Sequence, residues 1–374
     1  MRALLVLTIL AAAVLAAPPR SHQLTKDYSF EQYRRDFGKA YDSPAELVAR
    51  EAVFQGKLKK ILAHNADGKQ SYKMGVNHLT DRFPAEVKRL MGSRVIERSA
   101  ETAALKKKPF VKEHQVSGQV LPKSVDWRLA VPPVLTAVKN QGDCGSCWTF
   151  GSTETLEAHW ARATGILMDL SPQQLVSCAP NPNQCGGIGG CEGSTVELAW
   201  DYLTTKGQVA TEWQYSYTSG NNGTNGACHA SFGTLSPVKL HGYTHVTSNN
   251  AEAVMDALAT VGPLAVNVAA MPWEHYESGI FDGCAYNITV DHVVQLVGYG
   301  VDQESGKKFW IVRNSWTPMW GEAGYIRLIR HDTPVCGWIV NPSQGTGCNG
   351  GPNQLWGCGQ CGVLYDTLYP NVTP

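Results

Sequence analysis

The chain has 374 residues, and its 32 Lys and Arg balance 32 Asp and Glu, so the formal net charge is zero. This length allows more than one packed unit. Neither half carries the aromatic-interleaved basic patch of a nucleic-acid binder, which argues against that class of function. The charge is uneven, however. Residues 17–120 carry 20 Lys and Arg against 12 Asp and Glu (net +8), and residues 121–374 carry 11 against 20 (net −9). This asymmetry predicts two parts that attract each other, although two merely soluble surfaces remain the alternative.

Residues 1–17 predict a secretory signal peptide, because Arg2 precedes an apolar run that ends in small residues. The run is too short for a confident membrane span, and no later segment is long enough. Asn222, Asn287 and Asn371 each begin an Asn-x-Thr sequon, as expected on an oxidising secretory route. We therefore expect a lysosomal, vacuolar or extracellular protein that does not associate with membranes.

All eleven cysteines lie after Val120, so the N-terminal third carries no crosslink. An odd number in an oxidising compartment leaves at least one thiol unpaired or intermolecular. Within the cysteine-free part, Glu46, Phe54 and Ile61 fall largely at multiples of four, which predicts one face of a long helix. Residues 100–120 are polar and lysine-rich and predict an irregular, cleavable linker.

Cys147 opens a run in which apolar residues recur at three- and four-residue spacing, which predicts a helix over residues 147–164. A thiol at a helix N-terminus lies where the helix dipole favours negative charge, so its pKa is expected to fall. Helix starts are also predicted near Ser171 and Ser194, the latter continuing to Lys206. Three later segments are rich in β-branched and aromatic residues and predict strands, namely 293–300, 308–314 and 324–328.

A nucleophilic thiolate needs an imidazole and a group that orients it. Asp291-His292 and Asn314-Ser315-Trp316 follow far downstream of the run Gln141-Gly-Asp-Cys144-Gly-Ser-Cys147-Trp. This combination resembles the papain/cathepsin family of cysteine peptidases. The resemblance implies that Cys147 is the nucleophile, that His292 pairs with it, and that Asn314 orients the imidazole under the cover of Trp316. It further implies that Gln141 and the Cys147 backbone N–H stabilise the oxyanion. No metal and no cofactor are implied.

The resemblance also implies an α+β fold of two lobes with the active-site cleft between them, preceded by a helical pro-region. The boundaries we predict are a signal peptide at 1–17, an inhibitory pro-region at 18–120 and a peptidase domain at 121–374. A helical lobe of about 121–235 and a β-barrel-like lobe of about 236–374 would form this domain. Lys57 stands where the cathepsin L-like pro-region signature has asparagine, and Leu79 replaces its usual Phe.

The resemblance implies two disulfides position by position, Cys144–Cys191 and Cys178–Cys228. It also implies a C-terminal partner for Cys284, for which Cys336 matches counted forward and Cys361 matches counted back, and we favour Cys361. An apparent insertion at about 337–360 departs from the family pattern. Four cysteines remain unassigned, namely Cys185, Cys336, Cys348 and Cys358. They can pair with one another in three ways.

The resemblance also predicts the pocket for the second substrate residue before the scissile bond. Asp366 would form its floor if Cys361 holds the family position, and Asn341 would do so if Cys336 does. We favour Asp366, which would admit Arg or Lys as well as Leu or Phe, with a solvated loop acid as the alternative. The other residues expected in the binding cleft are Gly193, Ser194, Thr195, Val196, Asn267, Val290, Asp291 and Trp316.

The leading interpretation is a cysteine endopeptidase made as a zymogen, with protein and peptide substrates and its own pro-region as inhibitor. Cystatin-type inhibitors are possible further partners, and a monomer is expected. One alternative is a catalytically silent binding protein on the same scaffold, but such relatives lack the nucleophile. A second is a thiol-disulfide oxidoreductase using the Cys144-x-x-Cys147 pair, although nothing resembles the βαβ setting of that class.

Overall fold

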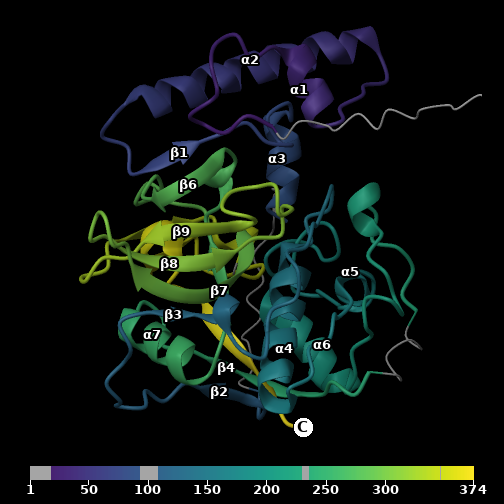
Figure 1. Cartoon of the computed structure of the whole chain (residues 1–374). Helices are drawn as coiled ribbons and strands as arrows, with labels where there is room; N and C mark the ends of the chain where they lie inside the picture. Colours follow the sequence, from purple (N-terminus) through teal and green to yellow (C-terminus); the bar gives the residue numbers. More distant parts are fainter. Residues whose placement is uncertain (1–17, 93–107, 230–235, 346) are drawn as a thin grey trace, which may run out of the picture.

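A computed structural model of the chain describes residues 18–92, 108–229, 236–345 and 347–374. The predicted signal peptide and residues 93–107 of the predicted linker lie outside the described residues. Residues 18–92, here called the N-terminal unit, form a layer at the top of Figure 1. Residues 108–374, here called the main body, lie beneath it, with a helical part beside a sheet.

The N-terminal unit contains three helices and one strand: α1 (Phe30–Asp36), α2 (Pro44–Ala66), β1 (Tyr72–Met74) and α3 (Pro84–Leu90). The predicted long helix is α2. It begins because the Ser43 hydroxyl accepts a hydrogen bond from the Glu46 N–H and because Pro44 occupies the first turn. Phe54 and Ile61 are both buried, and the Phe54 ring packs against Phe30 and Tyr33 of α1.

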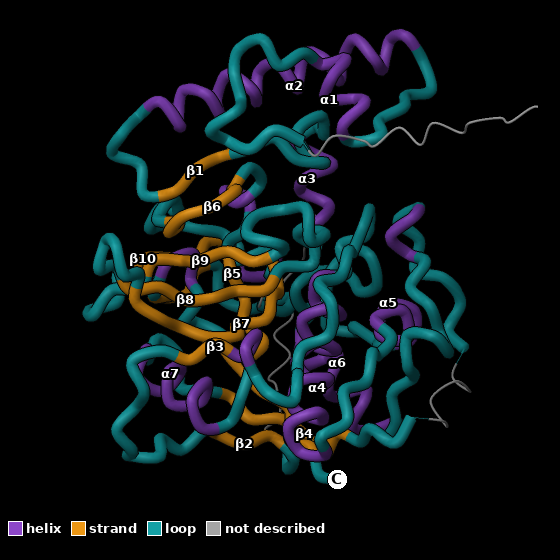
Figure 2. The backbone as a smooth tube through the Cα atoms, viewed as in Figure 1, coloured by secondary structure: helices purple, strands orange, loops and turns teal. Residues whose placement is uncertain are grey.

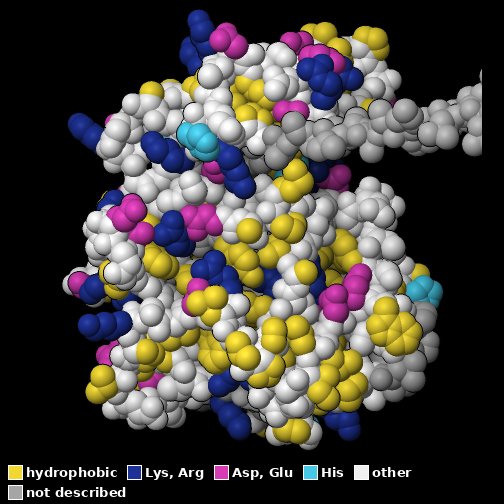
Figure 3. Space-filling model, in the orientation of Figure 1, with side chains coloured by type: hydrophobic (Ala, Val, Ile, Leu, Met, Phe, Trp, Pro, Cys, Tyr) yellow, Lys and Arg dark blue, Asp and Glu magenta, His cyan; other side chains and the backbone are white. Residues whose placement is uncertain are grey.

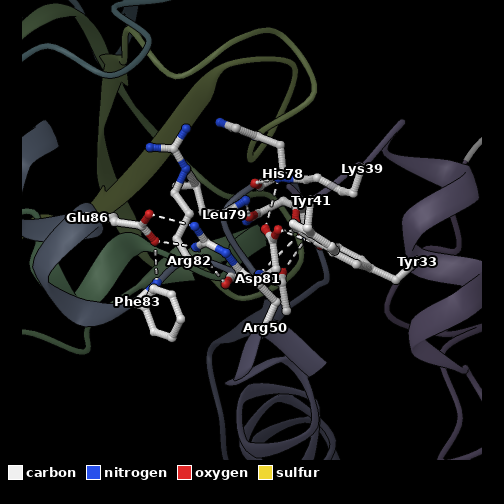
Figure 4. Close-up of polar contacts among 12 residues, drawn as sticks. Tyr33, Lys39, Tyr41, Arg50, His78, Leu79, Asp81, Arg82, Phe83 and Glu86 are labelled. Atoms are coloured by element: carbon white, nitrogen blue, oxygen red, sulfur yellow. Dashed lines mark hydrogen bonds and ion pairs between the residues drawn. The ribbon is translucent and has the colours of Figure 1, made fainter. Parts of the chain in front are cut away.

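A network of ionisable side chains ties α1, α2 and α3 together (Figure 4). The Asp81 carboxylate accepts hydrogen bonds from the Tyr33 hydroxyl (2.8 Å), the Lys39 ammonium (2.8 Å) and the Tyr41 hydroxyl (2.9 Å). Beside it, the Arg50 guanidinium on α2 forms an ion pair with Glu86 on α3. Charged groups therefore hold together a unit that contains no disulfide.

The helical part of the main body consists of α4 (Cys147–Thr164), α5 (Pro172–Cys178) and α6 (Val196–Lys206). All three confirm helices predicted from the sequence. The two longer ones end at Gly165 and Gly207, which both adopt the left-handed conformation that favours glycine. Figure 2 shows these helices gathered on one side of the main body, next to the strands.

The sheet has ten strands in an open path, β1-β6-β9-β8-β7-β5-β12-β4-β2, with β3 paired to β7. Its predicted strands are confirmed as β7, β8 and β9, and the described strands form no closed barrel. The strands of the main body in this sheet are β2 (Val111–Glu113), β3 (Val125–Asp126), β4 (Leu240–His245), β5 (Leu264–Val268), β6 (Tyr276–Phe281), β7 (His292–Val301), β8 (Lys308–Arg313), β9 (Tyr325–Ile329) and β12 (Thr367–Val372).

Two strands lie where the sequence predicted other structure. The segment expected to be an irregular linker contains β2, which pairs in parallel with β4. The half expected to be helical contributes β3, which pairs with β7. In both places the backbone polar groups find partners on an existing strand, which local sequence patterns do not reveal. Conversely, α7 (Ala251–Thr260) is a helix in the predicted β lobe.

The apparent insertion forms a separate two-stranded sheet of β10 (Cys336–Val340) and β11 (Gln354–Cys358). All three predicted disulfides are present: Cys144–Cys191, Cys178–Cys228 and Cys284–Cys361. The four remaining cysteines form one of the three possible pairings: Cys185–Cys348 and Cys336–Cys358. The fold is α+β with two lobes, as predicted.

Opposite charges meet as individual ion pairs between the N-terminal unit and the main body, namely Lys57–Glu274 and Arg82–Asp143. On the face drawn in Figure 3, cationic and anionic side chains are interspersed over both parts. Within the described residues, no helix is both long and apolar enough to cross a membrane.

The three sequons differ in exposure. Asn222 and Asn287 are exposed, whereas the Asn371 side-chain nitrogen is buried and has no hydrogen-bond partner among the described residues. A glycan attaches to that nitrogen, so the fold disfavours glycosylation at Asn371.

Candidate active site

Cys147 is the first residue of α4, and its thiol is the one free cysteine among the described residues. The side chain is buried, with 3% of the residue exposed. Cys144 is bonded to Cys191 across a neighbouring loop, so it is not available to pair with Cys147. The helix therefore presents a single thiol at the end where backbone N–H groups lack partners.

His292 is the first residue of β7, and its orientation is fixed by two neighbours. Its Nε2 lies 2.8 Å from the Asn314 side-chain oxygen. Because the Ser315 backbone N–H also donates to that oxygen (2.8 Å), the oxygen is the acceptor and His292 Nε2 carries a proton. The Trp316 ring packs against the imidazole with ring centroids 5.0 Å apart. The imidazole Nδ1 is buried and has no hydrogen-bond partner among the described residues.

Gln141 is buried next to this group. Its side-chain oxygen accepts hydrogen bonds from the Ser315 hydroxyl (2.8 Å) and the Trp316 indole N–H (3.2 Å). These contacts orient the amide nitrogen, which donates to the Leu90 carbonyl oxygen (2.7 Å) and the Cys144 carbonyl oxygen (3.0 Å). The Leu90 carbonyl oxygen of the N-terminal unit thus accepts a hydrogen bond from the Gln141 amide nitrogen, which was expected to donate to the oxyanion.

The end of the N-terminal unit covers the thiol itself. Gly92 adopts a positive φ of 64°, and a Cβ built on it would lie 3.6 Å from the Cys147 sulfur and 3.0 Å from the Gly145 carbonyl oxygen. A Cβ on Gly193 would lie 1.6 Å from the Gly92 oxygen. Glycines on both sides therefore allow backbone to approach backbone across the cleft.

The cover over the cleft changes the protonation states of Cys147 and His292. Burial raises the pKa of the Cys147 thiol to about 12. Burial also lowers the pKa of the His292 imidazole to about 4, although the hydrogen bond to Asn314 opposes this. Both groups are therefore neutral at neutral pH, because desolvation penalises each charged form. The low thiol pKa expected from the helix N-terminus does not hold while the cleft is covered.

A small cavity joins two of the four candidate catalytic residues to four of the nine predicted binding residues. The cavity is lined by Cys147, His292, Gly193, Ser194, Asn267 and Asp291. Thr195 caps α6 through a hydrogen bond from the Leu198 N–H (3.4 Å), and Val196 is fully buried behind it. Val290 is buried directly before Asp291, and burial raises the pKa of the Asp291 carboxyl to about 7.

Neither Asp366 nor Asn341 is among the residues that line the cavity, but their surroundings differ. The Asn267 amide nitrogen donates to an Asp366 carboxylate oxygen (2.9 Å), which connects Asp366 to the cavity wall. Asn341 is exposed at the end of β10. Burial, followed by the nearby charge of Glu197, raises the pKa of Asp366 well above its usual value.

Comparisons with known proteins agree with this geometry. Residues 121–352 match the model of the papain family cysteine proteases, and residues 30–87 match that of the cathepsin propeptide inhibitor domain. The chain belongs to the papain family of cysteine proteases. It is 34% identical to cathepsin L of Sarcophaga peregrina, over 90% of this chain and 97% of that one. It is 32% identical to cathepsin L1 of Drosophila melanogaster, over 90% and 89%.

Solved zymogens share the fold of this papain-family protease. The digestive procathepsin L 3 from Tenebrio molitor larval midgut matches at a TM-score of 0.69 and 28% identity, over 91% of this chain and 97% of that one. A recombinant stem bromelain precursor matches at 0.71 and 30%, over 92% and 98%. The protein is a papain-like cysteine peptidase, and its N-terminal unit contains a propeptide inhibitor domain that acts on its own chain. Nothing in these matches favours a silent binding protein or an oxidoreductase.

Of the six residues that line the cavity of this protease and that sequence reasoning missed, four come from two segments without any predicted site residue. Met91 and Gly92 come from the N-terminal unit, and Gln344 and Gly345 come from the insertion between β10 and β11. The first pair could have been suspected from the position of the pro-region before the peptidase. The second pair carried no motif, and only the unassigned cysteines on either side marked this segment as fixed in place.

Proposed function

We propose that Cys147, His292, Asn314 and Gln141 carry out peptide hydrolysis once the N-terminal unit has left the cleft. The observation that carries this proposal is the orientation of the His292 imidazole. Its Nε2–H is held by Asn314, so Nδ1 is the free acceptor, and His292 lines the same cavity as the Cys147 thiol. Exposure of the cleft to water removes the desolvation that keeps both groups neutral. An ion pair of thiolate and imidazolium then becomes accessible.

In the proposed reaction, the Cys147 thiolate attacks the carbonyl carbon of the scissile peptide bond and forms a C–S bond. The negative charge moves to the carbonyl oxygen, where the Gln141 amide and the Cys147 backbone N–H donate hydrogen bonds. Loss of one such donor typically costs about 3 kcal/mol of transition-state stabilisation. The C–N bond then breaks, and His292 gives its proton to the departing amine. Water, deprotonated by His292, hydrolyses the thioester and restores the thiol.

Titration with an epoxide-type cysteine-peptidase inactivator tests this assignment. We expect one equivalent to label Cys147 in the processed chain and to abolish peptidase activity. The Cys147→Ser variant, which keeps the size of the side chain, should neither be labelled nor cleave peptides. An unlabelled, correctly processed chain would instead support a silent scaffold.

We also propose that acid triggers self-processing near Leu121, which releases residues 18–120 from the peptidase domain at 121–374. Ion pairs between the two parts, such as Arg82–Asp143, support this because they need ionised carboxylates. A zymogen that is not shortened at acid pH, even with active enzyme added, would contradict the proposal.

The cellular route is part of the same proposal. The predicted signal peptide, the five disulfides and the exposed Asn222 and Asn287 sequons support passage through the secretory pathway to a lysosome, a vacuole or the outside of the cell. Cystatin-type inhibitors and a monomeric state are proposed as well. Glycosidase treatment of the secreted chain tests the two sequons, and we expect no glycan at Asn371.

For substrate choice, we propose that Asp366 lets the second residue before the scissile bond be Arg or Lys as well as Leu or Phe. Its contact with Asn267 at the cavity wall supports this. The raised pKa of Asp366 means that a bound cation would help to ionise it, so the preference should strengthen as the pH rises. Comparable cleavage of Phe-Arg and Arg-Arg substrates is expected, and Asp366→Asn should lose mainly the latter. An unchanged ratio in the variant would remove Asp366 from the pocket.

A further inference from the structure

The segment between β10 and β11 spans the two lobes at one side of the cavity. We call residues 341–345 and 347–352 of this segment the strap. On the β-lobe side, the strand before it is fixed to Ile288. The Ile288 N–H donates to the Trp338 carbonyl oxygen (3.0 Å), and the Val340 N–H donates to the Ile288 carbonyl oxygen (2.8 Å). The strap therefore leaves the β lobe beside Ile288, three residues before the cavity-lining stretch that starts at Asp291.

On the helical-lobe side, the strap is held by one covalent bond and two hydrogen bonds. Cys348 forms a disulfide with Cys185. The Gly186 N–H donates to the Gly347 carbonyl oxygen (2.9 Å), and the Asn349 N–H donates to the Asn183 carbonyl oxygen (3.0 Å). The strap is thus attached to both lobes and runs from one to the other.

Between these attachments the strap packs directly against the candidate binding cleft. Gln344 and Gly345 line the cavity that also contains Cys147 and His292. A Cβ on Gly345 would lie 1.7 Å from the Val290 carbonyl oxygen, so the strap touches the backbone of the β-lobe wall. A Cβ on Gly186 would lie 2.6 Å from the Gly345 carbonyl oxygen and 2.7 Å from the Ser194 carbonyl oxygen. No open channel of side-chain width separates the strap from either wall at these glycines.

We propose that the strap closes the substrate cleft just beyond the pocket for the second residue before the scissile bond. This inference rests on the proposed function, because the pocket is itself a prediction, with Thr195, Val196, Asn267 and Val290 as its expected walls. An extended chain advances about 3.3 Å per residue, so the third residue of a substrate running along the cleft would meet the strap. The third substrate residue must therefore turn outward, and residues still farther from the scissile bond make no contact with the cleft. The protease therefore recognises only a short substrate segment on the N-terminal side of the scissile bond. It favours substrates whose chain bends at the third residue before that bond.

A series of capped fluorogenic peptides tests this. All share the same two residues before the scissile bond and carry zero, one, two or three further alanines on the N-terminal side. For the processed native enzyme, kcat/KM should stay within about twofold across the series, because remote residues add no binding energy to the transition state. Mass-spectrometric disulfide mapping of the assayed sample verifies that Cys185–Cys348 is intact under the reductant used.

Two variants open the strap. In one, a short Gly-Ser turn replaces residues 342–352 together with Cys185→Ser, so that the Cys336–Cys358 hairpin keeps its disulfide. In the other, Cys185→Ser and Cys348→Ser release the strap without shortening it. Both should show kcat/KM rising by about fivefold or more along the series, as remote contacts become available.

The outcomes separate this inference from the proposed function. Epoxide titration counts the competent sites in each sample, so a variant that folds poorly only lowers the site number. A native enzyme whose kcat/KM rises by about fivefold or more along the series overturns the strap inference. Because this outcome is defined on the native series alone, it decides even if neither variant folds. Absence of any titratable thiol would instead refute the role of Cys147.

Discussion

The N-terminal unit and the main body of this protease are stabilised by different chemistry. The main body is crosslinked by five disulfides, including one that joins residues 163 positions apart. The N-terminal unit has no cysteine, and the carboxylates of Asp81 and Glu86 hold its elements together. Disulfides are unaffected by mild acid, whereas ionised carboxylates lose their partners when protonated. In the proposed processing, the part that leaves is therefore held by acid-sensitive contacts alone, whereas the part that remains is also crosslinked by bonds that acid does not break.

Asp81→Ala should have the largest effect on the difference in stability between the N-terminal unit and the main body. The substitution leaves the half-buried Lys39 ammonium and the buried Tyr33 hydroxyl without their shared acceptor. Removing one partner of a buried ion pair costs about 3 kcal/mol or more. We expect amide exchange to accelerate throughout the N-terminal unit while β7 and β8 keep their protection, measured by mass spectrometry on the Cys147→Ser background.

The matched control is Glu31→Gln, because the Glu31 ion pairs with Arg34 and Arg35 are exposed. Such surface pairs contribute about 0–1 kcal/mol, so exchange in the control should be nearly unchanged. Equal acceleration in the N-terminal unit and the main body would mean that the two are not independently stabilised.

The pH at which the zymogen processes itself should be set by the carboxylates within the N-terminal unit. Burial opposes the effect, but Lys39 holds the pKa of Asp81 below its usual value, and hydrogen bonds from Arg50 likewise lower the pKa of Glu86 despite its burial. The ionised forms therefore stabilise the folded unit above about pH 4, and that stabilisation is lost as the pH falls through the lowered values.

Glu86→Gln should consequently move processing to a higher pH. The variant keeps the shape of the side chain but loses the charge that pairs with Arg50, at a cost of about 2 kcal/mol. Gel analysis of processing half-times from pH 3 to pH 6 measures this, and Glu31→Gln again serves as the control. A pH profile that coincides with that of the native zymogen would show that Glu86 takes no part in the trigger.

Much of this organisation was accessible from the sequence. The helix at 147–164 was predicted with its observed bounds, because its apolar spacing is regular, and the structure shows that it ends at Gly165 in the left-handed conformation. His292 and Asn314 were found through a resemblance, and the structure brings them within 2.8 Å.

Contacts between groups that lie far apart in the chain could not be predicted from the sequence. The Leu90 carbonyl reaches Gln141 across 51 positions with no side-chain pattern to announce it. The path of the strap depends on which of three cysteine pairings forms. The raised pKa of the Cys147 thiol depends on what covers the helix end, whereas the sequence indicates only the helix end itself.

A more local test concerns the backbone contact over the thiol. Gly92→Val adds a side chain where a Cβ would lie 3.0 Å from the Gly145 carbonyl oxygen, at a backbone conformation that β-branched residues avoid. We expect the segment to be displaced, at a cost of about 1.4 kcal/mol or more, and Cys147 in the intact zymogen to be labelled about tenfold faster at neutral pH. Gly68→Ala is the control, because a Cβ there meets nothing within 4 Å. Equally slow labelling of both variants would mean that another part of the unit protects the thiol.

The smallest effect on the cover over Cys147 should come from Lys57, the residue that differs from the family signature. Lys57 forms an ion pair with Glu274 of the main body, and both side chains remain partly exposed, at 15% and 18%. Lys57→Asn restores the residue of the signature but is too short to keep the pair, which should cost about 1 kcal/mol. Labelling of Cys147 in the zymogen should then become about fivefold faster, and the difference should shrink at high salt.

Lys59→Asn, on the exposed side of the same helix, controls for the loss of one positive charge. Because burial raises the pKa of Glu274 against the opposing effect of Lys57, Glu274→Gln should itself cost little. The two changes combined should then weaken the cover less than Lys57→Asn alone, because no unpaired Glu274 carboxylate is left. A double variant as weak as Lys57→Asn would mean that Lys57 acts mainly through the carbonyl oxygens of Leu79 (3.2 Å) and Arg82 (2.5 Å) within the N-terminal unit.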